Sequence, residues 1–176
     1  MTKTEYDYIV VGAGSAGAVL ANRLSESGEY KVLCLEAGTA GSDYFWSRVP
    51  IGMAKLMNRP AVNWCFSSEP DEGSGGRRIP IPRGKMLGGS SSINGMVFIR
   101  GQPQDYDHWA QLGNRGWSYS DVLPIFKKME SYDGGSDETR GRDGILRVTD
   151  EAPDICPLHE RMIAAAEKIG IPYTKD

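Results

Sequence analysis

The chain contains no long hydrophobic run and no recognisable leader segment. No apolar stretch approaches the roughly 18 residues that a membrane-spanning helix needs, so we expect no transmembrane segment. The N-terminus lacks a charged segment followed by an apolar core and a cleavage site, which predicts no secretory signal. We therefore expect a cytoplasmic protein, and peripheral membrane association of a longer parent chain stays open.

The chain is also poor in cysteine and histidine. Its three cysteines, Cys34, Cys65 and Cys156, are widely spaced and form no C-x-x-C pair, which argues against a zinc site or a redox dithiol and predicts reduced thiols. The two histidines, His108 and His159, belong to no H-E-x-x-H motif and to no Ser–His–Asp order, so we expect structural or surface roles. We assign no metal site and no catalytic residue to this chain.

No charge of one sign dominates the sequence. The 20 Lys and Arg residues are scattered and nearly balance the 23 Asp and Glu residues, so we expect no nucleic-acid partner. The Asp-rich stretch 133–144 lacks the spacing of an EF-hand calcium loop, and we expect a solvated surface loop there.

Glycine, in contrast, is abundant and clustered. The 22 glycines gather in a few short stretches, and such clusters mark places where the backbone turns sharply or approaches another group closely. Two clusters, at 12–17 and 84–95, carry the functional argument.

The first cluster lies inside a strand–helix–strand pattern. The apolar run Tyr8–Val11 predicts a buried strand, residues 18–24 predict a helix with one apolar face, and Lys31–Glu36 predicts a second strand. A strand, a glycine-rich turn, a helix and a second strand within about 30 residues are typical of a βαβ unit in an α/β fold.

The turn carries the pattern G-x-G-x-x-G. Gly12 allows the tight turn, Gly14 lets the backbone approach a pyrophosphate, and Gly17 lets the helix pack closely on the strand. Glu36, at the end of the second strand, can accept hydrogen bonds from a ribose diol and would repel a 2′-phosphate, which disfavours NADP. The pattern does not separate FAD from NAD, and a glycine-rich turn without a nucleotide is the structural alternative.

The second cluster opens a longer motif. Gly88 and Gly89 are followed by three serines and then by Asn94, which together offer little bulk and many hydrogen-bonding groups. Such a loop suits close packing against a flat ring with polar edges, and the apolar run 96–99 would bury the neighbourhood of that ring. A tight turn before a buried strand is the structural alternative.

The remaining segments predict short elements. Two short strands around Trp64–Phe66 and Ile79–Ile81 flank the loop 71–76. Asp105 is the expected cap of a helix that ends at Gly113, and Ser120 is the expected cap of a helix that runs to Glu130. Pro157 opens a last helix, which Gly170 closes.

The stretch from Gly84 to Asp107 resembles the N-terminal signature of the glucose–methanol–choline (GMC) oxidoreductases. The first motif matches this family as well, including Glu36-Ala-Gly38. The further matches are Asn63–Phe66, Pro82–Gly84 and Gly113–Trp117, so the resemblance spans essentially the whole chain. Within the family, the sequence is similar to choline dehydrogenases and related bacterial alcohol dehydrogenases.

The resemblance implies an α/β architecture: a Rossmann-like FAD-binding fold, incomplete because later segments are missing, with the start of an α+β substrate domain. Residues 1–38 would form the FAD-binding βαβ unit, and 39–76 a connecting segment with short strands. Residues 77–101 would form the flavin-contacting signature segment, and 102–176 a helical region that leads to a truncated substrate domain.

The resemblance also implies a set of FAD contacts. Gly12, Gly14, Ser15, Ala16 and Gly17 would hold the pyrophosphate, and Glu36, next to Ala37, the adenosine ribose. Met86, Leu87, Gly88, Gly89, Asn94, Gly95, Met96 and Val97 would border the isoalloxazine ring. Some family members attach the flavin through a His immediately before the Asn; Ile93 stands there, so we expect non-covalent FAD.

Members of the family oxidise an alcohol to an aldehyde or ketone by hydride transfer to flavin N5. The expected partners are therefore a small alcohol and an electron acceptor, which is oxygen, a quinone or another carrier. The family's catalytic base is a His near the C-terminus of a longer chain, so these 176 residues would supply FAD binding and be inactive alone, with poor solubility or weak FAD retention. An NAD-linked dehydrogenase and a non-catalytic nucleotide-binding module are the competing hypotheses.

Overall fold

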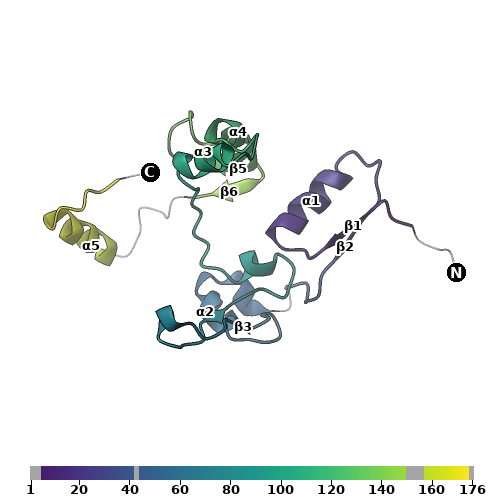
Figure 1. Cartoon of the computed structure of the whole chain (residues 1–176), viewed down its shortest axis with the longest axis horizontal. Coiled ribbons are helices and arrows are strands. Elements are labelled where there is room, and N and C mark those ends of the chain that lie inside the picture. The colour runs from purple at the N-terminus through teal and green to yellow at the C-terminus, as the bar shows by residue number, and fades with distance from the viewer. Residues whose placement is uncertain (1–4, 42–43, 150–156, 175–176) are drawn as a thin grey trace. The chain divides into compact units, whose positions relative to one another are not determined.

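The computed structural model describes residues 5–41, 44–149 and 157–174 of the chain (Figure 1). The chain divides into two compact units, Met1–Val97 and Phe98–Asp176, which are described separately. Cys156 lies outside the described residues. Among the described residues, no helix is long and apolar enough to cross a membrane.

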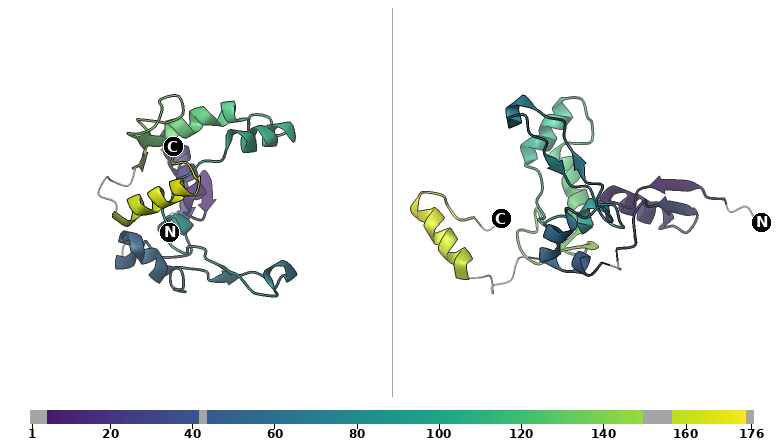
Figure 2. Two further views of the ribbon diagram at one scale, coloured as in Figure 1. Left: turned by 90° about the vertical axis from the view of Figure 1, so that its left-hand side faces the viewer. Right: turned by 90° about the horizontal axis from the view of Figure 1, so that it is seen from below.

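The first unit begins with the predicted βαβ unit, which the structure confirms. Strand β1 (Tyr8–Val11) pairs in parallel with β2 (Val32–Leu35), and helix α1 (Ser15–Ser25) connects them and packs on both (Figure 2). Gly12, at φ +92°, makes the turn out of β1. A Cβ on Gly17 would come within 1.8 Å of the Gly12 carbonyl oxygen, so glycine is what allows α1 to pack against the strand.

The parallel sheet carries apolar side chains that the described residues of this unit leave uncovered. Val10 is buried, but Ile9 is 60% and Val11 is 83% exposed. Parallel strands normally bury both faces of their sheet, so these side chains mark surface that a larger fold would cover.

A second layer of short elements follows the βαβ unit. The short helices are η1 (Phe45–Arg48), η2 (Pro50–Gly52), α2 (Met53–Leu56), η3 (Glu72–Ser74) and η4 (Gly89–Ser92). The expected pair of strands around the loop 71–76 is confirmed as antiparallel β3 (Phe66–Ser67) and β4 (Pro80–Ile81). A hydrophobic cluster holds this layer together; its buried members are Leu56, Val62, Met86 and Ile93.

The apolar run 96–99 does not form the buried strand of the structural alternative. It forms no strand, and Val97 is 81% and Ile99 is 83% exposed. Met96 has φ +59°, which interrupts an extended backbone, and its amide donates to the Asn94 side-chain oxygen rather than to a neighbouring strand.

The second unit contains helices α3 (Pro103–Gln111), α4 (Tyr119–Met129) and α5 (Pro157–Lys168), and strands β5 (Glu130–Tyr132) and β6 (Leu146–Val148), which pair in parallel. The three expected helices are confirmed, but two of their caps were predicted wrongly. Gln102 and Ser118 are the N-caps, not Asp105 and Ser120. An acidic residue at the third helical position accepts a hydrogen bond from the cap's own amide, which places each cap earlier in the chain.

The polar stretch 133–144 connects β5 to β6, and half of its residues are exposed, but it is more firmly anchored than a solvated loop. Glu130 is fully buried and pairs with Arg100 at 2.6 Å and with Arg140 at 3.1 Å. Its carboxylate also accepts the Gly141 amide at 2.9 Å, and Arg142 donates to the Gly134 carbonyl at 2.8 Å. A buried carboxylate with two guanidinium partners therefore holds this loop against the strand.

Candidate functional site

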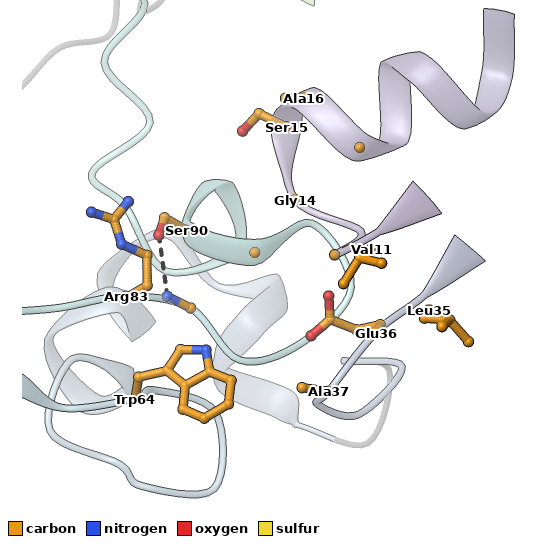
Figure 3. A pocket seen from close by; sticks show the side chains of 14 residues that line it. Val11, Gly14, Ser15, Ala16, Leu35, Glu36, Ala37, Trp64, Arg83 and Ser90 are labelled. Atoms are coloured by element: carbon orange, nitrogen blue, oxygen red, sulfur yellow. Dashed lines mark hydrogen bonds between the residues drawn. The ribbon is translucent and has the colours of Figure 1, made fainter. Parts of the chain in front are cut away.

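The carboxyl ends of β1 and β2 open into a cavity of about 720 Å³ in the first unit (Figure 3). Parallel strands end at the same edge of their sheet, and ligands of open α/β sheets bind outside that edge. The sequence-predicted residues that line this cavity are Gly12, Gly14, Ser15, Ala16, Gly17, Glu36, Ala37 and Gly89.

The start of α1 forms one wall of the cavity. Helix α1 begins at Ser15, and Gly14 at its N-cap supplies no side chain to satisfy the first amides of the helix. The first turn of a helix has free N–H groups and a partial positive charge, which favour an anion. This wall therefore has the chemistry of a phosphate site.

Glu36 ties the end of β2 to the turn after β1. One carboxylate oxygen accepts the Ala13 amide at 2.9 Å, and the other accepts the Gly38 amide at 2.9 Å. Each carboxylate oxygen can accept more than one hydrogen bond, so both keep acceptor capacity toward the cavity. Figure 3 shows this carboxylate extending from the end of β2 toward the glycine-rich segments.

The signature segment packs against this edge through its backbone. The Gly88 amide donates to the Ala13 carbonyl at 2.8 Å, and the Leu87 amide donates to the Thr39 carbonyl at 2.9 Å. A Cβ on Gly89 would lie 2.8 Å from the Gly14 Cα. The two glycine clusters, 75 positions apart in the sequence at these two residues, are therefore in direct contact.

The other signature residues lie in different surroundings. Asn94 and Met96 line a second, smaller cavity of about 150 Å³ in the same unit. Met86 is 1% exposed within the hydrophobic cluster and lines neither of these two cavities. The remaining predicted ring contacts, which line neither of these two cavities, are Leu87, Gly88, Gly95 and Val97.

Two side chains that line the larger cavity were not predicted from the sequence. The Trp64 indole lies beside it, with the Lys85 ammonium 4.6 Å from the ring centroid. Arg83 also lines this cavity, and its guanidinium makes no hydrogen bond or ion pair with any described residue. Both residues fall in segments that match the family, but the pattern alone assigned no role to either.

A buried asparagine explains why these two side chains lie together. Asn63 is 2% exposed, and its side-chain oxygen accepts the Cys65 amide at 2.9 Å and the Arg83 amide at 2.8 Å. The Trp64 amide donates to the Arg83 carbonyl at 2.9 Å. These bonds hold residues 63–65 against residue 83, which brings the indole and the guanidinium to the same cavity.

The two histidines lie elsewhere. His108 is exposed on α3 and His159 is exposed on α5, both in the second unit. Neither lines the 720 Å³ cavity.

The sequence matches the family described as "GMC oxidoreductase" over residues 6–176. It is 44% identical over 172 residues to a protein from Brucella anthropi named oxygen-dependent choline dehydrogenase, covering 98% of this chain and 31% of the relative. The protein of the same name from Photobacterium profundum is 45% identical over 174 residues, covering 98% of this chain and 30% of the relative. The chain thus spans about a third of the length of these relatives.

Solved structures show the same relationship. Pyridoxine 4-oxidase from "Mesorbium loti" superposes with a TM-score of 0.87 at 34% identity, covering 96% of this chain and 33% of the other. A formate oxidase superposes with a TM-score of 0.85 at 28% identity, covering 97% of this chain and 31% of the other. The expected α/β, Rossmann-like FAD-binding fold is confirmed, and the chain belongs to the GMC oxidoreductase family.

Proposed function

We propose that this chain is the FAD-binding part of an enzyme that oxidises an alcohol to an aldehyde or ketone. The observation that carries the proposal is the 720 Å³ cavity, which the α1 N-terminus, Glu36 and the signature segment enclose together. A cavity with free helix amides at one wall and a carboxylate at another matches a pyrophosphate that is linked to a ribose.

The residues of the cavity fit the ADP half of FAD. The amides of Ser15, Ala16 and Gly17 would hold the pyrophosphate, where a glycine at position 14 leaves room for close approach. Glu36, beside Ala37, would accept hydrogen bonds from the ribose diol with its remaining lone pairs. The unpaired Arg83 guanidinium adds a positive charge for the phosphates, and the Trp64 indole offers a flat face to a base.

The flavin end would lie against the signature segment, near Asn94, Gly95, Met96 and Val97. When bound, FAD would accept the hydride that leaves the alcohol carbon. The residues of this chain would bind and orient the cofactor, and the base that accepts the hydroxyl proton would come from a part of the enzyme outside this chain. An electron acceptor, such as oxygen or a quinone, would then reoxidise the enzyme.

We propose that FAD is held without a covalent bond. Ile93 has no heteroatom that could bond to the flavin, and its side chain is 4% exposed within the hydrophobic cluster. Two of the relatives are named for choline and pyridoxine, which carry alcohol groups, and a third for formate, which does not, so the proposal specifies the class of alcohols rather than one compound.

The test is the visible absorption spectrum of the full-length protein that carries this chain, before and after acid precipitation. We expect the bands of oxidised flavin, released into the supernatant by acid. Flavin that stays with the pellet would contradict the non-covalent assignment. A protein that shows no flavin band after addition of FAD would contradict the flavoenzyme proposal and favour a nicotinamide cofactor.

A further inference from the structure

The second cavity of the first unit has walls from two segments that are distant in sequence. Its volume is about 150 Å³. One wall comes from the stretch 46–53 within the connecting segment, and the other comes from the end of the signature segment. The residues that matter here are Trp46, Pro50 and Met53 on the first wall, and Ser91, Asn94 and Met96 on the second.

The short helix η4 separates this cavity from the larger one. Gly88 and Gly89 have φ values of +86° and +55°, which turn the chain sharply into η4. As a result, Ser90 lines the larger cavity while the next residue, Ser91, lines the smaller one. The Ser91 hydroxyl lies 2.5 Å from the Ser15 hydroxyl at the start of α1. The phosphate-binding end of the larger cavity therefore adjoins the smaller cavity.

The smaller cavity combines polar and apolar groups: Asn94 is a polar group of the signature segment, and Trp46 and Met53 are apolar groups of the stretch 46–53, which also contributes Ser47 and Arg48. The Asn94 oxygen accepts the Met96 amide at 3.0 Å, and its NH₂ group has no partner among the described residues. On the other wall, the Trp46 indole is 37% exposed and Met53 is half-buried. The Met53 sulfur lies only 3.5 Å from the position that a Cβ on Gly95 would occupy, so the two walls are close together.

We propose that the stretch 46–53, through Trp46 and Met53, forms the wall that faces one edge of the flavin ring, opposite Asn94. A flat ring with a hydrogen-bonding edge and an apolar edge matches the Asn94 amide on one side and the Trp46 and Met53 side chains on the other. The cavity is smaller than the roughly 300–1,000 Å³ typical of pockets that enclose a whole ligand, so it takes an edge of the ring and not all of it. This inference rests on the proposed function, because it requires that FAD occupies the larger cavity.

The experiment measures the fluorescence of the bound flavin in the full-length protein. An indole in contact with a flavin quenches its emission by donating an electron to the excited ring, and phenylalanine cannot do so. Trp46→Phe should therefore raise the emission of bound flavin several-fold. Trp64→Phe is the matched control, because Trp64 lines the larger cavity of the same unit. Trp64→Phe should weaken FAD binding while leaving the emission of bound flavin unchanged.

A second variant covers the case in which Trp46→Phe does not fold. Met53→Leu keeps the volume of the side chain but removes its polarisable sulfur, and it should shift the visible absorption band of the flavin. The inference would be overturned by unchanged flavin emission in Trp46→Phe. If only Met53→Leu folds, an unshifted absorption band would overturn it. In both cases the proposal that the protein binds FAD would stand. A wild-type protein that binds no FAD would instead overturn the proposed function.

Discussion

The two units of the chain are held together by different kinds of contact. In the first unit, backbone groups and glycines make the decisive contacts, as where the Gly88 amide meets the Ala13 carbonyl and Gly89 lies against Gly14. In the second unit, charged side chains do so, with Glu130 fully buried between Arg100 and Arg140. Contacts made by backbone groups and glycines leave space for a polar ligand to approach. Buried ion pairs hold a loop in place and leave little space for a ligand.

The largest expected effect is on the stability of the second unit. Glu130→Ala would leave two guanidinium groups without their buried partner, and the loss of one member of a buried ion pair costs about 3–5 kcal/mol. The full-length variant should show this loss in urea unfolding followed by circular dichroism. Glu138→Ala, in the same loop but exposed, is the control and should change the unfolding free energy little. Equal losses in both variants would contradict the role of the buried carboxylate.

The next largest effect is expected on FAD affinity when a backbone contact of the first unit is disturbed. Gly17→Ala would place a Cβ 1.8 Å from the Gly12 oxygen and force α1 away from β1. Overpacking of this kind costs about 1–3 kcal/mol, so FAD affinity should fall by roughly 10- to 100-fold as the phosphate wall shifts. Titration of the cofactor-free full-length protein with FAD measures this loss.

Gly28→Ala provides the comparison for Gly17→Ala. Gly28 has φ +75°, but no atom lies within 4 Å of the position that a Cβ would occupy there, so alanine would add backbone strain without a clash near the cavity. We expect a modest loss of stability and an unchanged affinity for FAD. If Gly28→Ala weakened FAD binding as much as Gly17→Ala, general destabilisation would explain both results, and the close packing of α1 would have no specific role in phosphate binding.

A smaller effect is expected for Arg83, a charged side chain of the first unit. The Arg83 guanidinium lacks a partner among the described residues, and we propose that it faces the phosphates of FAD. Hydrogen bonds to charged groups contribute about 1.5–3 kcal/mol, so Arg83→Met should weaken FAD binding by roughly tenfold or more, with a smaller dependence on salt.

Arg78→Met is the matched control for Arg83→Met. Arg78 pairs with Glu69 at 3.0 Å on the surface, where both side chains are largely exposed, and an exposed pair contributes little. FAD affinity in this variant should equal that of the wild type. A similar loss in both variants would mean that net charge, and not the position of Arg83, governs binding.

The contrast between the two kinds of contact also explains which features the sequence predicts. The βαβ unit follows from a known motif with fixed spacing: Gly12 and Gly17 lie five positions apart, and Glu36, although 23 positions from Ala13, occupies the acidic position that the motif expects at the end of the second strand. The roles of Trp64 and Arg83 depend on Asn63, which bridges segments about 20 positions apart, and no local pattern records such a bridge. The anchoring of the loop 133–144 depends in the same way on Arg100, whose partner Glu130 is 30 positions away.

The exposed run 96–99 shows a different limit of prediction from the sequence. Its apolar composition predicts burial. A hydrophobic pattern indicates that a side chain favours burial, but it does not identify the surface that covers the side chain. The preference of this run for burial therefore follows from its composition, whereas the surface that would cover it does not.

The smallest expected effect concerns the cap of α4, where the sequence pattern predicted the wrong serine. Ser118 is the N-cap, and its amide and hydroxyl both donate to the Asp121 carboxylate, at 3.1 and 2.5 Å. Ser118→Ala should lower the unfolding free energy by about 1 kcal/mol, within the range measured for the loss of a serine cap. Ser120→Ala removes a hydroxyl whose one hydrogen-bond partner among the described residues is Ser118, and it should cost less. The reverse order in urea unfolding would restore Ser120 as the cap and would show that the acidic residue three positions after Ser118 does not determine where the helix begins.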